Sequence, residues 1–186
     1  MIEFKNLMKE NWAIKKGSKI ISTYSDQFKS EVRGLLIAYL DKYQDKLFRK
    51  QVNDILRVIA ATDFPAHYPG LAEYFLNNMG SLKEVIKDDQ MLLSDLTMNF
   101  VRTLKVAMGE RSRKRGDSKN IFYTVYLKLM EGFHEFWDYL HTNTQRFIGE
   151  YRNNPNQIEK FFKLTRKADK IYISFLCCGC DEMIEK

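Results

Sequence analysis

Apolar residues recur every three or four positions along most of the chain, which is the spacing of one face of an α-helix. No segment alternates apolar and polar residues over the length of a strand bounded by turns. The pattern therefore predicts an all-α protein of seven main helices without a sheet. Its apolar stripes are Phe4, Leu7, Met8 and Trp12; Phe28, Val32, Leu35, Leu36, Tyr39 and Leu40; Phe48, Val52, Ile55, Leu56 and Ile59; Leu92, Leu96, Phe100, Val101, Leu104 and Met108; Phe122, Val125, Leu129, Phe133, Phe136, Leu140, Thr144, Phe147 and Tyr151; and Ile158, Phe161, Phe162, Leu164 and Ile171.

Capping residues and prolines set the expected helix ends. We expect helices over about residues 2–14, 25–40, 45–61, 69–79, 88–108 and 118–151, and a seventh from 155 onward, with a loop at KKGSK, residues 15–19. Ser25 and either Asp117 or Ser118 are suitable N-caps, and Asn154 with Pro155 forms an N-cap and first-position pair. Antiparallel hairpins of about forty residues suit HEAT-like repeats, although periodicity alone allows a bundle or a solenoid.

The segment TDFPAHYPGL, residues 62–71, joins the third and fourth helices. Proline disfavours helical backbone in the residue before it, so Phe64 should end the third helix. Pro69 suits the first position of the next helix because it has no amide to leave unpaired, and Asp63 stands where a turn residue is expected. With Phe64 and Tyr68 buried against both helices, we interpret Asp63, Phe64, Pro65, Tyr68 and Pro69 as a structural corner rather than a ligand site.

Composition limits the class of protein. The chain has 186 residues, 45% of them hydrophobic, which is enough for a core and too apolar for intrinsic disorder. It contains no run of eighteen apolar residues, so we expect no membrane insertion. The formal charge of +6 permits an acidic partner without identifying nucleic acid. Three clustered cysteines make no disulfide framework, and a reducing compartment is the simpler interpretation.

Candidate chemistry is sparse. Cys177, Cys178 and Cys180 resemble part of a metal site, but zinc normally takes four ligands in two spaced pairs, and His134 and His141 complete no known spacing. We therefore expect no metal and no cofactor.

Other motifs also favour a protein that is not an enzyme. His67 has no neighbouring nucleophile or carboxylate, and the chain lacks a phosphate-cradling glycine-rich loop and a nucleophile elbow. RSRKR, residues 111–115, fits either a nuclear localisation or nucleic-acid patch or a solvated loop, and we favour the loop.

ILRVIAATDFPAHYPGLAEYF resembles a signature of the importin-beta (karyopherin) family, in which a helix ending in Ile-Ala-Arg precedes Asp-Tyr-Pro-x-x-Trp-Pro and a leucine. The chain departs from it at Ala61 for arginine, Phe64 for tyrosine and Tyr68 for tryptophan, and the two aromatic exchanges keep the packing role. The matching positions are Ile59, Ala60, Asp63, Phe64, Pro65, Tyr68, Pro69 and Leu71.

The resemblance continues on both sides of this signature. FKNLMKENW, residues 4–12, is similar to the end of the family's first repeat, and FFKLTRKADKIYISF, residues 161–175, to a later helix. Residues 96–140 resemble the third-repeat region, with matches at Leu104, Lys105, Arg111, Lys114, Arg115, Phe122, Tyr123 and Trp137. No single motif is highly specific, but their order and spacing cover nearly the whole chain.

The resemblance implies a fold and a role. The fold would be antiparallel helix hairpins stacked as a HEAT-repeat, armadillo-like right-handed superhelix, with residues 1–186 a segment of a larger receptor. Its unfinished ends would expose Leu7 and Trp12 on one side and Phe175 and Leu176 on the other. The role would be a nuclear transport receptor that binds the GTP form of the GTPase Ran and carries protein cargo into the nucleus. Nucleoporins would be further partners, direct nucleic-acid contact is not expected, and the protein would occupy cytoplasm, nucleus and nuclear pore.

Lys50, Asn53 and Arg57 are the candidate Ran-binding residues. They are spaced by three and four residues, so we expect them to share one exposed face of the third helix. The resemblance places this helix on the inner wall that holds the GTPase. The same polar stripe would also suit a helical-repeat scaffold or a nucleic-acid-binding protein without a transport role, because any amphipathic surface helix has a polar face.

Overall fold

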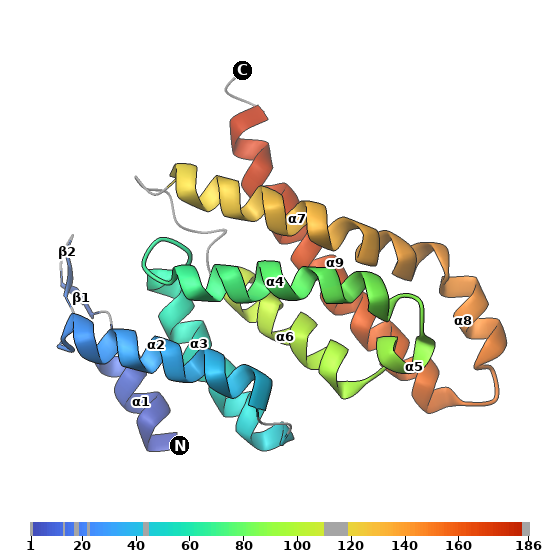
Figure 1. Ribbon diagram of the computed structural model, residues 1–186, viewed down its shortest axis with the longest axis horizontal. Helices are drawn as coiled ribbons and strands as arrows, with labels where there is room; N and C mark the ends of the chain where they lie inside the picture. Colours follow the sequence, from blue (N-terminus) through green and yellow to red (C-terminus); the bar gives the residue numbers. More distant parts are fainter. Residues whose placement is uncertain are drawn as a thin grey trace. The chain divides into compact units, whose positions relative to one another are not determined.

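The computed structural model describes residues 2–12, 14–16, 19–21, 23–42, 45–109 and 119–183, and these are overwhelmingly helical (Figure 1). The all-α class is therefore confirmed, apart from one short hairpin. Along the chain the elements are α1 (Ile2–Asn11), β1 (Ile14–Lys16), β2 (Lys19–Ile21), α2 (Asp26–Lys42), α3 (Lys46–Asp63), α4 (Pro69–Val85), α5 (Asp89–Leu92), α6 (Asp95–Gly109), α7 (Lys119–Thr142), α8 (Thr144–Glu150) and α9 (Pro155–Met183). Across the described segments, no helix is both long enough and apolar enough to cross a bilayer.

The chain forms two compact units, Met1–Tyr74 and Phe75–Lys186, with α4 contributing residues to both. In the first unit α3 packs against both α1 and α2, and α2 and α3 form the expected antiparallel hairpin (Figure 1). The Ser25 hydroxyl accepts a hydrogen bond from the Phe28 amide at 3.3 Å, which confirms Ser25 as the cap of α2. A Cβ atom added at Gly70 would lie 3.2 Å from Ile37 Cδ1, so glycine allows α4 to begin close against α2.

The prediction of no sheet is wrong at residues 14–21. β1 and β2 pair antiparallel, with Ile14 opposite Ile21 and Lys16 opposite Lys19. The dipeptide Gly-Ser between two short segments that carry isoleucine is a hairpin-turn signal, and it explains why KKGSK is not a plain loop. Helix α1 accordingly ends at Asn11 rather than near Ile14.

In the second unit α9 packs against both α6 and α7, and α8 contacts α7 and α9. The expected helix over residues 88–108 is broken into α5 and α6. Asp88 caps α5, and the Ser94 hydroxyl accepts from the Thr97 amide at 3.3 Å to start α6. This interruption shifts the helical register, so Leu96 is 58% exposed although the stripe placed it in the core. The rings of Phe75 and Phe100, 6.0 Å apart, join α4 to α6 as the second hairpin.

The expected thirty-residue helix over residues 118–151 is also broken, at Asn143 between α7 and α8. Three consecutive polar side chains bond to carbonyls of the preceding turn. Thr142 Oγ1 donates to the Asp138 carbonyl, Asn143 Nδ2 to that of Tyr139 and Thr144 Oγ1 to that of Leu140. Such bonds compete with the backbone ladder and end or bend a helix. Asp117, Ser118 and the RSRKR loop lie outside the described residues.

The expectation of bare ends is only half right. Leu7 and Leu176 are about half exposed, as expected, but Trp12 and Phe175 are buried. The Phe175 ring contacts the rings of Tyr126 and Phe133, with centroids 5.8 and 6.1 Å away. Leu35 and Phe162 are exposed although both belong to predicted stripes, because each lies at the edge of a wide apolar face. Helix α9 starts at Pro155, as predicted from the Asn154–Pro155 pair.

Candidate functional site

The proposed Ran-facing stripe of α3 is only partly exposed. Lys50 and Arg57 are exposed, but Asn53 is buried, with 5% of its surface accessible, so the expectation that all three share an exposed face is wrong. Helix α3 packs against two helices, which buries a wider arc than one apolar stripe indicates. The line of exposed or half-exposed positions runs instead through Leu47, Lys50, Asp54 and Arg57, where Arg57 Nη1 lies 3.4 Å from Asp54 Oδ1.

The corner is built largely as predicted. Phe64 adopts an extended backbone and ends α3, Pro69 opens α4, and the side chains of Phe64, Pro65 and Tyr68 are buried. Asp63 differs from the prediction. It is the last residue of α3 rather than a turn residue, and it is 5% exposed.

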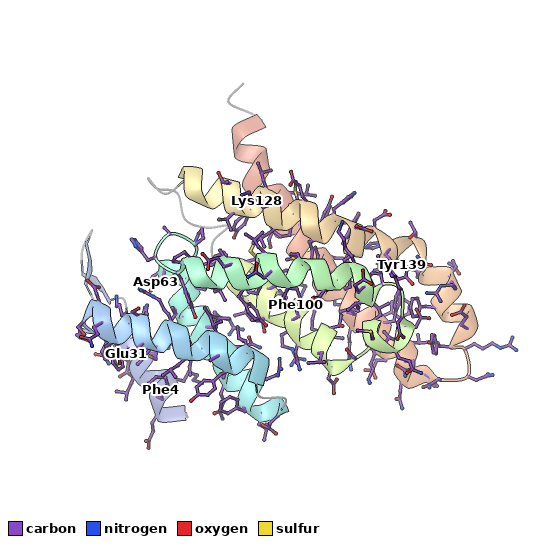
Figure 2. All side chains as sticks on the ribbon, viewed as in Figure 1. Phe4, Glu31, Asp63, Phe100, Lys128 and Tyr139 are labelled. Carbon is purple, nitrogen blue, oxygen red and sulfur yellow. The ribbon has the colours of Figure 1, made fainter. Side chains whose placement is uncertain are left out.

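Asp63, labelled in Figure 2 at the end of α3, is the acceptor for one side chain from α2 and one that directly follows α1. Its Oδ2 atom accepts hydrogen bonds from Trp12 Nε1 at 3.0 Å, from Arg33 Nε at 3.0 Å and from Arg33 Nη2 at 2.6 Å. Its Oδ1 atom accepts from Thr62 Oγ1 at 2.8 Å. A buried carboxylate needs both a countercharge and hydrogen-bond donors, and Asp63 has both.

Arg33 and Tyr68 complete this cluster, which we call the Asp63 cluster: Trp12, Arg33, Thr62, Asp63 and Tyr68. The Tyr68 hydroxyl donates to the Arg33 carbonyl at 2.6 Å, and the Arg33 guanidinium lies 5.7 Å from the centre of the Trp12 ring. Burial raises the pKa of Tyr68 well above its usual value, with the nearby Arg33 charge opposing the shift in part. Because these polar groups bond to one another, the cluster fastens α1, α2, α3 and the start of α4 together.

A second polar cluster lies where α7 packs on α9, and the sequence alone does not reveal it. The rings of Trp137 and Tyr172 stack in parallel with centroids 4.2 Å apart, and those of His134 and His141 lie beside Tyr172 and Trp137. Trp137 Nε1 donates to Asp169 Oδ1 at 3.0 Å, and His141 Nε2 lies 2.7 Å from the same oxygen. In this ring cluster, one broad face of the Trp137 ring and one broad face of the Tyr172 ring cover each other.

Arg146 holds the broken helices of the second unit together. Its two terminal nitrogens bond to the two oxygens of Asp89 at 2.8 and 2.9 Å, and one of them also donates to the Tyr139 hydroxyl at 2.8 Å. The bond to Asp89 raises the pKa of Arg146, and burial raises the pKa of Tyr139. This bidentate pair joins α5 to α8.

A concentration of positive charge lies where α6 packs on α9. The pKa of Lys167 is lowered, first by partial burial and then by the charges of Arg102, Lys105, Lys163 and Arg166. We call these five residues, with the exposed neighbour Lys170, the cation row. The cation row is not apparent from the sequence because its members belong to helices about sixty residues apart, and only the packing of these helices brings the charges together.

Replacing Lys167 with methionine is expected to stabilise the protein slightly. A lysine whose pKa is lower in the folded state destabilises that state while it is charged, and the penalty is relieved as pH rises through the folded pKa toward the usual lysine value of 10.5. Methionine keeps most of the apolar stem, so the free energy of unfolding at pH 7 should rise by about 0.5 kcal/mol after allowing for solvent screening. Urea titration provides the measurement, with Lys128→Met on α7 as an exposed control of little effect. If Lys167→Met lowered the free energy of unfolding while Lys128→Met did not, the charge of Lys167 would not destabilise the folded state.

Metal-ligating residues do not converge in the described part of the chain, where no group of three or more His, Cys, Asp and Glu side chains could hold an ion. Cys177 is an exposed free thiol, whereas the side chains of Cys178 and Cys180 lie outside the described set. Compared with known proteins, the chain matches no family model, no curated protein and no solved structure.

Proposed function

We propose that the chain is the N-terminal HEAT-repeat segment of a nuclear transport receptor of the importin-beta type. Its partners would be the GTP form of Ran, protein cargo bound for the nucleus, and nucleoporins. The observation that carries this proposal is the 3.0 Å hydrogen bond between Trp12 and Asp63, 51 residues apart. Trp12 belongs to the motif FKNLMKENW and Asp63 to ATDFPAHYPGL, so the two motifs that carry the resemblance meet in one buried contact.

The helix packing supports stacked repeats. In a solenoid of helical hairpins, each hairpin buries its apolar face against its neighbour. Within the first unit α1 packs on α3, the second helix of the α2–α3 pair. Within the second unit α6 packs on α9, and the two run in the same direction (Figure 1). Contacts between the second helices of successive pairs are what a HEAT array requires, and we propose the right-handed superhelix on this basis.

The proposed GTPase-facing surface is the exposed line of α3. It offers the cations Lys50 and Arg57, the carboxylate of Asp54 and, at one end, Leu47 with 72% of its surface accessible. An exposed leucine beside charged side chains suits a protein partner, because interfaces combine apolar contact with a polar rim. Asn53 is excluded from this surface by its burial.

Charge reversal at two of these positions tests the surface. We expect Lys50→Glu with Arg57→Glu to weaken binding to GTP-loaded Ran by about tenfold, which corresponds to ~1.4 kcal/mol. Isothermal titration of the purified variant measures the affinity, and far-UV circular dichroism checks that helicity is unchanged.

Lys128→Glu with Arg152→Glu is the matched control, since it makes the same change of charge at exposed positions of the other unit. The control should bind with the affinity of the unaltered chain. If both variants lost affinity equally, net charge alone would explain the effect. If neither lost affinity, the α3 line would not belong to the binding surface.

A further inference from the structure

Several cations on the α6–α9 face have no ion-pair partner among the described residues. Within the described part of the chain, Arg102, Arg166 and Lys170 form no ion pair, and the amine of Lys167 donates to a backbone carbonyl, that of Lys163. Lys163 is paired with Glu159 on the same helix. The next acidic side chain of α9, Asp169, is occupied by Trp137 and His141 on the α7 side.

The row has a regular geometry. Lys163, Arg166 and Lys170 are separated by three and four residues, and Lys163, Lys167 and Lys170 by four and three, so all four lie along one side of α9, which advances 5.4 Å per turn. Lys163, Arg166 and Lys170 are exposed. Arg102 and Lys105, one turn apart on α6, widen the line, because both lie close enough to Lys167 for their charges to contribute to its lowered pKa. The surface is therefore a strip about two helical turns long.

In the described part of the chain, the strip has little of the second element of a single-strand nucleic-acid site. Such sites combine a basic groove with aromatic side chains on which bases stack. The large rings on the other side of α9, Trp137 and Tyr172, stack on each other, and their remaining sides are next to His141 and His134. Phe162, four residues before Arg166 on α9, is 45% exposed, but its ring already contacts that of Phe161 edge-on, with centroids 5.9 Å apart. Among the described residues the strip therefore offers no series of rings for successive bases, and it recognises charge and its spacing.

We propose that the cation row binds an acidic α-helical segment of a partner protein, whose carboxylates recur at i, i+3 or i+4, and i+7. Such a helix presents one carboxylate per turn at the same pitch as the row. Bound carboxylates would also offset the repulsion from neighbouring cations, which adds to partial burial in lowering the pKa of Lys167. The assignment uses only residues of the second unit and does not depend on the transport role.

Two model peptides test the proposal with the full chain. Both are alanine-based helices of about twenty residues with capped ends and the same number of glutamates. In one the glutamates lie on a single face at the stated spacing, and in the other they are distributed around the helix. A thymidine oligonucleotide of equal charge is the third probe. Fluorescence anisotropy of each labelled probe gives its affinity at two salt concentrations.

The one-face peptide should bind at least about fivefold more tightly than the distributed peptide, and more weakly at the higher salt concentration. Arg166→Glu with Lys170→Glu should reduce its affinity by at least about tenfold, and Arg166→Gln with Lys170→Gln by a smaller factor. The Lys128→Glu, Arg152→Glu chain should bind as the unaltered chain does. Circular dichroism establishes that each variant is folded.

Three outcomes would overturn the proposal. Equal affinity for the two peptides would mean that only bulk charge is sensed. Tighter binding of the oligonucleotide would make the strip a nucleic-acid surface. No binding of the one-face peptide to the folded chain would remove the site altogether.

Discussion

Replacing Asp63 with alanine is expected to lower the free energy of unfolding by about 3–5 kcal/mol. A single oxygen of this carboxylate accepts hydrogen bonds from Trp12 and Arg33. Its removal leaves the Arg33 charge largely buried without its partner and the indole N–H of Trp12 without an acceptor, and both groups lose their compensation for desolvation. Urea denaturation followed by circular dichroism at pH 7 measures the change.

Asp54→Ala is the matched control on the same helix. Its ion pair with Arg57 is exposed, so its loss should cost less than about 0.5 kcal/mol. Combining Asp63→Ala with Arg33→Met should recover part of the lost stability, because the second change removes the uncompensated charge. If Asp63→Ala were no more harmful than Asp54→Ala, the Asp63 cluster would not hold the first unit together.

Replacing Tyr68 with alanine is expected to cost about 3–5 kcal/mol, as is usual for truncating a buried aromatic side chain. Tyr68→Phe keeps the ring and loses only the hydrogen bond to the Arg33 carbonyl, so about 1 kcal/mol is expected. Thermal unfolding of the two variants separates packing from hydrogen bonding. An unchanged melting temperature in Tyr68→Ala would contradict the interpretation of residues 62–71 as a packed corner.

The same side chain should give the stability a pH dependence. Because the pKa of Tyr68 is raised in the folded state, the unfolded chain loses this proton first as pH rises above the usual tyrosine value of 10.0. The stabilisation is complete below that pH and is lost progressively above it. Urea titrations between pH 8 and about 11 should therefore show a shallower decline for Tyr68→Phe than for the unaltered chain.

Features determined by local chemistry could be predicted from the sequence. The start of α2 at Ser25, the end of α3 at Phe64 and the starts of α4 and α9 at Pro69 and Pro155 each follow from the backbone preference of one or two residues. The central stripe residues, such as Ile55 and Leu104, are buried as their spacing indicates.

Features that depend on competing interactions were not predicted. The break at Asn143 results from three side chains bonding to carbonyls one turn earlier, although the apolar stripe continues through it. The spacing of Asn53 from Lys50 and Arg57 predicts an exposed face, but a helix packed against two neighbours also buries polar positions. Which of the adjacent residues Asn53 and Asp54 is accessible depends on how α3 packs against its neighbours, and the pattern of a single helix does not contain that information.

Contacts between residues far apart in the sequence were the hardest features to predict. Asp63 was identified as part of the corner, but its role as acceptor for Trp12 and Arg33 depends on three helices meeting. The cation row depends in the same way on α6 lying against α9. In both cases the residue types were visible in the sequence and their partners were not.

Binding of Ran in its two nucleotide states is the most direct test of the transport proposal. The chain of 186 residues is titrated with Ran loaded with a non-hydrolysable GTP analogue and, separately, with GDP. We predict saturable binding that is at least about tenfold tighter for the GTP-analogue form. Equal affinity for the two forms, or no binding of either by a chain whose helicity and cooperative unfolding are intact, would contradict the assignment to a nuclear transport receptor.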